Sequence, residues 1–147
     1  MEECSDRKNG EKEAYAVIGL GNPGREYSRT RHNVGARVVA LMCRRVGWEP
    51  SIRKSYAVWK KTELGSRIVY LVRPRAYMNV SGPAVRRFIE AEKIAIDRVL
   101  LVHDDLDLPL GQLRFKRKGS SGGHRGVSSV IEALGTESFN RLKIGIG

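Results

Sequence analysis

The chain has 147 residues, 41% of them hydrophobic, which suits one compact domain with a single apolar core. It carries 27 Lys and Arg against 16 Asp and Glu, a formal net charge of +11 that favours nucleic acid as a partner without distinguishing tRNA from other nucleic acids. No apolar run approaches the roughly 20 residues that cross a bilayer, and the two cysteines, Cys4 and Cys43, exclude a disulfide framework, so we expect a cytoplasmic protein with no membrane partner.

The first predicted elements follow an acidic start. Residues 1–14 contain five acidic side chains and no apolar stretch, so we predict a disordered N-terminal tail there and one domain over residues 15–147. Residues 14–20 are apolar and β-prone, and glycines follow at once, which predicts a buried strand that enters a loop. The next element is a helix with an apolar stripe formed by Val34, Val38, Leu41, Met42 and Val46 and closed by Gly47.

The middle of the chain predicts a hairpin, a helix and a central strand. Two β-rich runs, residues 55–63 and 66–72, flank a turn at Leu64 and Gly65. A helix follows, with Ser81 as its N-cap and an apolar face of Val85, Phe88 and Ile89. Residues 99–102 are continuously apolar, which predicts a strand covered on both faces, and His103, Asp104 and Asp105 come directly after it.

The last third continues the alternation of strands and helices. Residues 112–116 predict a strand, and the glycine-rich residues 119–126 lead into a helix that ends at Gly135. Residues 142–146 predict a final strand. The whole pattern predicts an α/β fold: a single-domain three-layer sandwich with a twisted mixed sheet flanked by helices.

The loop after the first strand satisfies the pattern G-x-G-x-x-G, through Gly19, Gly21 and Gly24, so a dinucleotide-binding site is one alternative. In that fold the helix begins inside the glycine motif, whereas here Pro23 and a polar stretch delay it until about Asn33. An acidic residue at the end of a second strand is also missing at the required distance. These differences argue against the cofactor site.

Four segments in chain order resemble the motifs of the bacterial peptidyl-tRNA hydrolase family. They are GLGNPG at 19–24 with Tyr27 and TRHNVG at 30–35, RP at 73–74 with YMNVSG at 77–82, HDDLDLP at 103–109, and GGHRG at 122–126 leading to IGIG at 144–147. The resemblance covers residues 16–147. It implies hydrolysis of the ester of peptidyl-tRNA, with no metal and no organic cofactor, and contacts to the acceptor arm and 3′ end of the tRNA.

The catalytic residues that the resemblance implies are His32, Asp104 and Asn22. Imidazole can accept a proton from water at neutral pH, which makes His32 the base, and Asp104 would orient it and stabilise its charged form. Asn22 would help to hold the peptide carbonyl and the attacking water. Without the resemblance, His32 is equally explained as a cap or surface residue, and the acidic cluster after residue 102 as a turn. A metal site at that cluster is disfavoured, because consecutive strand residues point to opposite faces.

The resemblance also implies two sets of substrate contacts. The residues of the cleft are Tyr27, Met78, Asn79, His124 and Arg125. The contacts to tRNA phosphates are Arg114, Lys116 and Lys143. Taken alone, Asn79 is a helix-capping residue and the basic run at 114–118 a solvated strand edge. Arg125 replaces the asparagine that the family usually has, so it would pair instead with a tRNA phosphate or with Asp105.

The chain also stops before the lid and C-terminal helix that members of the family usually have. We therefore expect exposed apolar surface, and a monomer with oligomerisation, instability or a fragment of a longer protein as the alternatives. The competing function is a weakly active or inactive RNA-binding member of the same fold, such as the plant intron-splicing relatives. Retention of His32 and Asp104 favours the enzyme.

Overall fold

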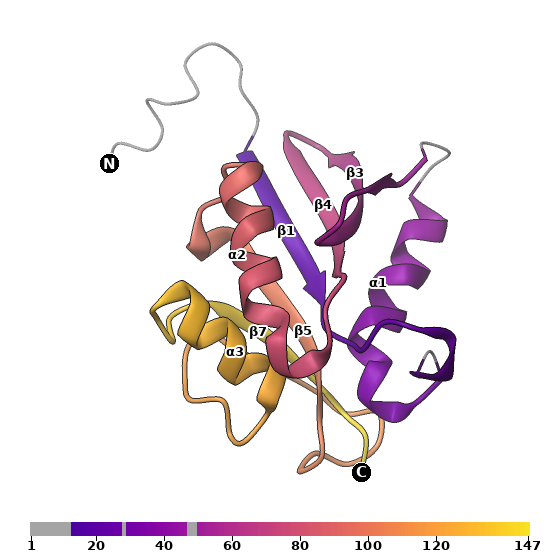
Figure 1. Cartoon of the computed structure of the whole chain (residues 1–147), viewed down its shortest axis with the longest axis vertical. Helices are drawn as coiled ribbons and strands as arrows, with labels where there is room; N and C mark the ends of the chain where they lie inside the picture. Colours follow the sequence, from indigo (N-terminus) through magenta and orange to yellow (C-terminus); the bar gives the residue numbers. More distant parts are fainter. Residues whose placement is uncertain (1–12, 28, 47–49) are drawn as a thin grey trace.

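The computed structural model describes residues 13–27, 29–46 and 50–147 (Figure 1). The first strand, β1, spans Glu13–Gly19, so the last two residues of the expected tail belong to the sheet. The remainder of that tail lies outside the described residues, as does Gly47, which was expected to close the first helix. That helix, α1, spans Val34–Arg45.

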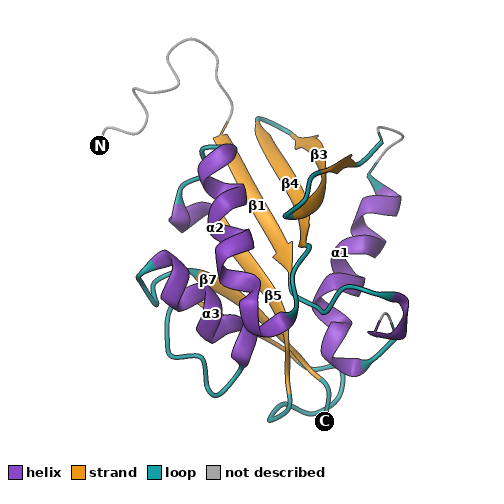
Figure 2. Ribbon diagram, viewed as in Figure 1, coloured by secondary structure: helices purple, strands orange, loops and turns teal. Residues whose placement is uncertain are grey.

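The strands form one seven-stranded mixed sheet in the order β2-β3-β4-β1-β5-β7-β6 (Figure 2). The strands after β1 are β2 (Ile52–Arg53), β3 (Ala57–Leu64), β4 (Arg67–Pro74), β5 (Val99–Asp105), β6 (Leu113–Lys116) and β7 (Asn140–Gly145). β1 runs parallel to β4 and β5, and β5 parallel to β7, whereas β3 and β6 pair antiparallel with their neighbours. The predicted mixed sheet and the hairpin of β3 and β4 are confirmed.

Helices cover both faces of the sheet, as predicted for a three-layer sandwich. The helices α2 (Ser81–Ala91) and α3 (Arg125–Leu134) lie together, and Figure 1 shows α1 apart from them across the sheet. Ile18 of β1 belongs to one buried cluster with Phe88 of α2 and Val130 of α3. No helix of the described ranges is long and apolar enough to span a membrane.

The buried face of α1 differs from the predicted stripe. Val39 and Gly35 are fully buried, whereas Leu41 and Met42 are 45% and 36% exposed. The buried residues lie against Gly19 of β1, where a Cβ would collide with both Gly35 and Val39. The helix therefore buries a face centred on these two residues, and Leu41 and Met42 stay at the surface.

Two boundaries also differ from the sequence prediction. Ser81 is the first residue of α2 and not its N-cap: a 3-10 helix, η4 (Met78–Val80), precedes it, and the Ser81 hydroxyl donates to the Met78 carbonyl oxygen at 2.9 Å. β5 extends to Asp105, so His103 and Asp104 lie inside the strand. Gly135 ends α3 in the left-handed conformation, with φ of 73°, as predicted.

Candidate active site

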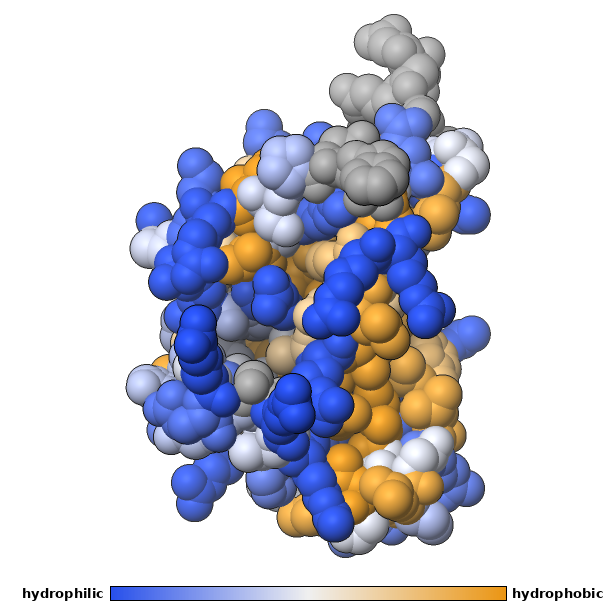
Figure 3. All heavy atoms as spheres, turned by 90° about the vertical axis from the view of Figure 1, so that its right-hand side faces the viewer, coloured by the Kyte–Doolittle hydropathy of each residue, from blue (hydrophilic) through white to orange (hydrophobic). Residues whose placement is uncertain are grey.

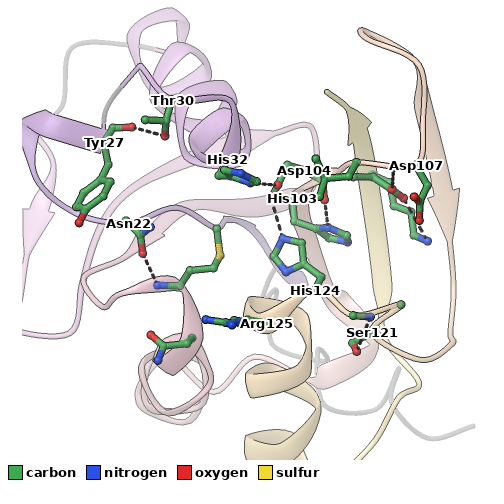
Figure 4. Close-up of a pocket in the computed structure, with 17 residues that line it drawn as sticks. Asn22, Tyr27, Thr30, His32, His103, Asp104, Asp107, Ser121, His124 and Arg125 are labelled. Carbon is green, nitrogen blue, oxygen red and sulfur yellow. Dashed lines mark hydrogen bonds and ion pairs between the residues drawn. The ribbon is translucent and has the colours of Figure 1, made fainter. Parts of the chain in front are cut away.

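A cleft of about 900 Å³ opens where β5 ends, and it gathers most of the residues that the sequence singled out (Figure 4). Its walls come from the loop after β1, from η4, from the end of β5 and from the glycine-rich loop before α3. The four motifs therefore meet at the carboxyl ends of the parallel strands. Parallel strands of α/β proteins usually carry their sites at these ends.

His32 reaches the cleft because two backbones approach each other closely. It lies in a 3-10 helix, η3 (Arg31–Asn33), directly before α1. A Cβ on Gly35 would collide with the carbonyl oxygen of Val102 in β5, and a Cβ on Gly19 would collide with the carbonyl oxygen of Gly35. The two glycines therefore let the start of α1 rest on the ends of β1 and β5, which brings His32 to Asp104.

The carboxylate of Asp104 binds two histidines, one with each oxygen. Its Oδ2 accepts a hydrogen bond from His32 Nδ1 at 2.8 Å, and its Oδ1 accepts one from His124 Nε2 at 2.7 Å. The Asp104 side chain is 4% exposed, whereas that of His32 is 59% exposed. An ionised carboxylate can only accept, so Nδ1 of His32 carries the proton and its Nε2 keeps a lone pair that can take a proton from water.

The charge of Asp104 follows from these contacts. Burial by itself would raise the pKa of its carboxyl group, but the hydrogen bond and electrostatic attraction of the His124 Nε2–H, together with the hydrogen bond from His32, outweigh it and hold the pKa below its ordinary value. Asp104 is therefore negative at neutral pH. It can stabilise a positive charge that forms on His32.

His124 has no ring nitrogen left for a substrate. Its Nδ1 accepts hydrogen bonds from the backbone N–H groups of Gly126 at 3.1 Å and Val127 at 3.2 Å, so it caps α3, while its Nε2 donates to Asp104. The resemblance implies a substrate contact for His124. The geometry supports a positioning role instead, because His124 fixes Asp104 and α3 in turn fixes His124.

Asn22 is held by Asn33, a residue for which the sequence indicates no role. Asn33 is 4% exposed; its Oδ1 accepts from the Asn22 N–H at 2.9 Å and its Nδ2 donates to the Asn22 carbonyl oxygen at 2.8 Å. The Asn22 side chain then accepts the Met78 N–H at 2.6 Å through its Oδ1. Its Nδ2 makes no hydrogen bond to a described residue, and it is a donor ready for an oxygen in the cleft.

His103 is the second cleft residue for which the sequence predicted no role. It is 3% exposed and lines the cleft, and its Nδ1 donates to the Asp104 carbonyl oxygen at 2.8 Å, while its Nε2 has no partner among the described residues. Burial, together with the neighbouring His124, lowers the pKa of His103 to about 4. It is therefore neutral at pH 7, and its ring packs edge-on against His124 at 4.7 Å.

The remaining predicted residues divide between the cleft and the outer strands. Tyr27, Met78, Asn79 and Arg125 line the cleft, and the Tyr27 ring packs edge-on against Tyr77 at 6.4 Å. Of the two partners considered for Arg125, a tRNA phosphate and Asp105, the second makes its ion pair with Lys143, at 3.6 Å, and with no arginine of the described ranges.

Of the three predicted phosphate contacts, Lys143 also lines the cleft. Arg114 lies opposite it in the antiparallel pairing of β6 and β7, and Lys116 lies two residues further along β6, which is exposed along its length. The three cations thus stand together at one edge of the sheet, beside the cleft. Within the described ranges, no three His, Cys, Asp or Glu side chains are grouped as a metal ion would require.

Comparison with known proteins extends these similarities over the whole domain. Residues 16–147 match the sequence model of the family described as peptidyl-tRNA hydrolase. The chain is 44% identical to the peptidyl-tRNA hydrolase of Shouchella clausii and 47% identical to that of Aquifex aeolicus, each over 131 residues. These alignments cover 89% of this chain and 71% and 68% of the two relatives. The crystal structure of peptidyl-tRNA hydrolase from Acinetobacter baumannii superposes with a TM-score of 0.85 at 34% identity, and the match covers 91% of this chain and 68% of that one.

Proposed function

Since the chain belongs to the peptidyl-tRNA hydrolase family, we propose that it hydrolyses the ester between a peptide and the terminal ribose of a tRNA, with His32 as the base. The observation that carries the proposal is the bond from His32 Nδ1 to Asp104, which leaves Nε2 of an exposed imidazole unprotonated in the cleft. An ester needs an activated water and support for the negative oxygen that develops, and both can come from this cleft.

In the first step, His32 Nε2 takes a proton from water as the water oxygen attacks the ester carbonyl carbon. Asp104 stabilises the imidazolium that results. In the second step, the bond from carbon to the ribose oxygen breaks, and His32 returns the proton to that oxygen. The products are a free tRNA and a peptide with a C-terminal carboxylic acid, which loses its proton to water at neutral pH.

Asn22 supports the carbonyl oxygen during the attack. Its Oδ1 is occupied by the Met78 N–H, so the side chain presents its Nδ2 donor to the cleft. Asn33 holds the Asn22 backbone from both sides, which keeps that donor in place without reorganisation during the reaction. Asn79 and Tyr27, which line the same cleft, would contact the peptide end of the substrate.

The tRNA would be held by its phosphates. Arg114, Lys116 and Lys143 lie at the β6 edge beside the cleft, where they can contact the acceptor arm near its 3′ end without reading sequence. Arg125 adds a permanent positive charge to the cleft wall. We propose that the protein acts as a monomer in the cytoplasm, where tRNA is charged and used.

The test is release of tRNA from N-acetylaminoacyl-tRNA by the wild type and by His32→Ala at equal folded concentration. The proposal predicts turnover by the wild type and a loss of at least about a hundredfold in the variant, as for removal of a general base. A folded wild type that binds tRNA and releases nothing above background would contradict the enzyme and favour the RNA-binding alternative. Equal rates for the two proteins would contradict the role of His32.

A further inference from the structure

A second groove, of about 860 Å³, lies beside α1, and all of its charged lining residues are arginines. They are Arg29, Arg37, Arg44, Arg53, Arg73 and Arg75. Figure 3 looks onto the side of the molecule that carries α1 and shows hydrophilic side chains on either side of a hollow. This arginine groove and the catalytic cleft share one lining residue among those described, Asn22.

The arginines of the groove come from separate parts of the chain. Arg37 and Arg44 stand seven residues apart on α1, which places them on one face of the helix about two turns apart. Arg53 lies in β2, and Arg73 lies at the end of β4. Side chains that the fold gathers from so many elements form one surface in space, not a charged run in the sequence.

The positive charges of the groove are not balanced by acidic side chains among the described residues that line it. No carboxylate of the described ranges lines it, although the chain as a whole carries 16 Asp and Glu for its 27 Lys and Arg. Arg75 donates to the Lys54 carbonyl oxygen at 3.0 Å, a hydrogen bond that neutralises no charge. A solvated face of a basic protein normally mixes both signs, because like charges gathered in one place repel each other and destabilise the fold.

The chemistry of the set indicates which anion it fits. All six residues are arginine and none is lysine, and the planar guanidinium matches phosphate oxygens with two parallel hydrogen bonds. A row of phosphates is the ligand that satisfies several such groups along one groove. The walls also contain apolar side chains, including Val34 and Leu41, against which a ribose can pack.

The outer part of the groove lies far from the tRNA contacts proposed on β6. Arg53 lies in β2 and Arg114 in β6, which are the two outer strands of the seven-stranded sheet, so roughly 29 Å of sheet separates them at about 4.8 Å per strand. The groove adjoins the catalytic cleft at Asn22, but an acceptor arm bound at β6 would leave its β2 side open.

We propose that the arginine groove binds the phosphate backbone of a second RNA molecule, separate from the tRNA whose ester is cleaved. Binding of RNA in the groove stands on the groove alone, whereas its being a second molecule rests on the proposed function. The proposed contacts are to phosphates, which carry no sequence information, so recognition is independent of sequence. The protein can thus hold its substrate and remain on another RNA at the same time.

The experiment measures binding of a short, blunt-ended RNA duplex by fluorescence anisotropy over a salt series, for variants that remove two charges each. Arg37→Gln/Arg44→Gln removes two exposed arginines of the groove. Arg45→Gln/Lys93→Gln is the matched control, because both residues are exposed and neither lines the groove. The groove variant should bind at least about tenfold more weakly, and its salt slope should fall by about 1.8, that is about 0.9 per lost phosphate contact, while the control changes by less than about threefold.

A parallel measurement of KM for N-acetylaminoacyl-tRNA shows whether the groove binds the substrate's own tRNA or a second RNA molecule. The groove variant should keep KM within about twofold of the wild type, whereas Arg114→Gln/Lys116→Gln should raise KM. Equal weakening of duplex binding in groove variant and control would overturn the proposal, since it would reflect net charge. A rise in KM as large as the loss of duplex binding would also overturn it, because the groove would then hold the substrate's own tRNA. If the wild type hydrolyses nothing, the proposed function fails and the duplex measurement still decides whether the groove binds RNA.

Discussion

Replacing Asp104 by Asn should remove the catalytic base while leaving every side chain in place. His124 cannot change its tautomer, because its Nδ1 receives the N–H groups of Gly126 and Val127, so its Nε2 must keep a proton and needs an acceptor. In the variant Asp104→Asn, the new amide oxygen therefore turns to His124, and the amide NH₂ turns to His32. His32 must then accept at Nδ1 and carry its proton on Nε2, the atom that should take a proton from water.

The loss in kcat should be at least about a thousandfold, since the variant loses both the correct tautomer and the negative charge that stabilises the imidazolium. KM should change little, because Asp104 is 3% exposed and its two carboxylate oxygens are bound to His32 and His124. Release of tRNA from N-acetylaminoacyl-tRNA under saturating substrate measures kcat directly. Asp105→Asn is the matched control: it removes a neighbouring carboxylate that pairs with Lys143, and it should stay within about tenfold of the wild type.

A second substitution separates the tautomer of His32 from the loss of charge. With His124→Ala added to Asp104→Asn, the amide oxygen is free to turn to His32 and restore its Nδ1–H form, so kcat should recover by about tenfold or more over the single variant. The double variant also loses the cap of α3, at a cost of about 1 kcal/mol, so folded protein must be quantified by circular dichroism. A single variant within tenfold of the wild type, or a double variant no faster than the single one, would contradict this mechanism.

Three other variants test the surroundings of His32 and Asp104. The pKa of His103 is about 4 in the folded protein against 6.5 for a free histidine, so the unfolded chain binds the extra proton first as the pH falls. The free energy of unfolding should therefore fall by about 3 kcal/mol between pH 6.5 and pH 4. In urea-unfolding experiments over this pH range, His103→Gln should reduce the fall, and an unchanged fall would contradict the reasoning. Asn33→Ala frees the backbone of Asn22 and should lower kcat/KM by about tenfold to a hundredfold with the fold retained, whereas an unaffected rate would show that Asn33 does not position Asn22 for catalysis. Gly35→Ala should cost about 3 kcal/mol or more in thermal or urea unfolding, because its Cβ would collide with the Val102 carbonyl oxygen, and a fully stable variant would show that α1 can move away.

Sequence patterns predicted the order of the main strands and helices because most of these elements are bounded by strong local signals. Glycine breaks end β1 and α3, and continuous apolar runs mark the buried strands. The predicted face of α1 was wrong because α1 packs through Gly35 and Val39 on Gly19 of β1, and the spacing of apolar residues does not record such a close approach of backbones. The two-residue strand β2 carries too little sequence to predict.

The candidate site was predicted through resemblance more than through local pattern. His32 and Asp104 are 72 residues apart in the chain, and no local sequence pattern around either residue predicts that they form a hydrogen bond. The roles of Asn33 and His124 depend on bonds to particular backbone groups, which become visible only in three dimensions. The arginine groove was missed for the same reason, since its members are scattered over residues 29–75.

Whether His32 can act as the base depends on its tautomer, which the ¹⁵N spectrum of the labelled protein reports above neutral pH. The chain has three histidines, so each can be assigned by substitution. The proposed mechanism predicts Nδ1–H for His32 and His103 and Nε2–H for His124, and a change of His32 alone in Asp104→Asn. Finding His32 of the wild type with its proton on Nε2 would contradict the mechanism, because the nitrogen in the cleft would then have no lone pair with which to activate water.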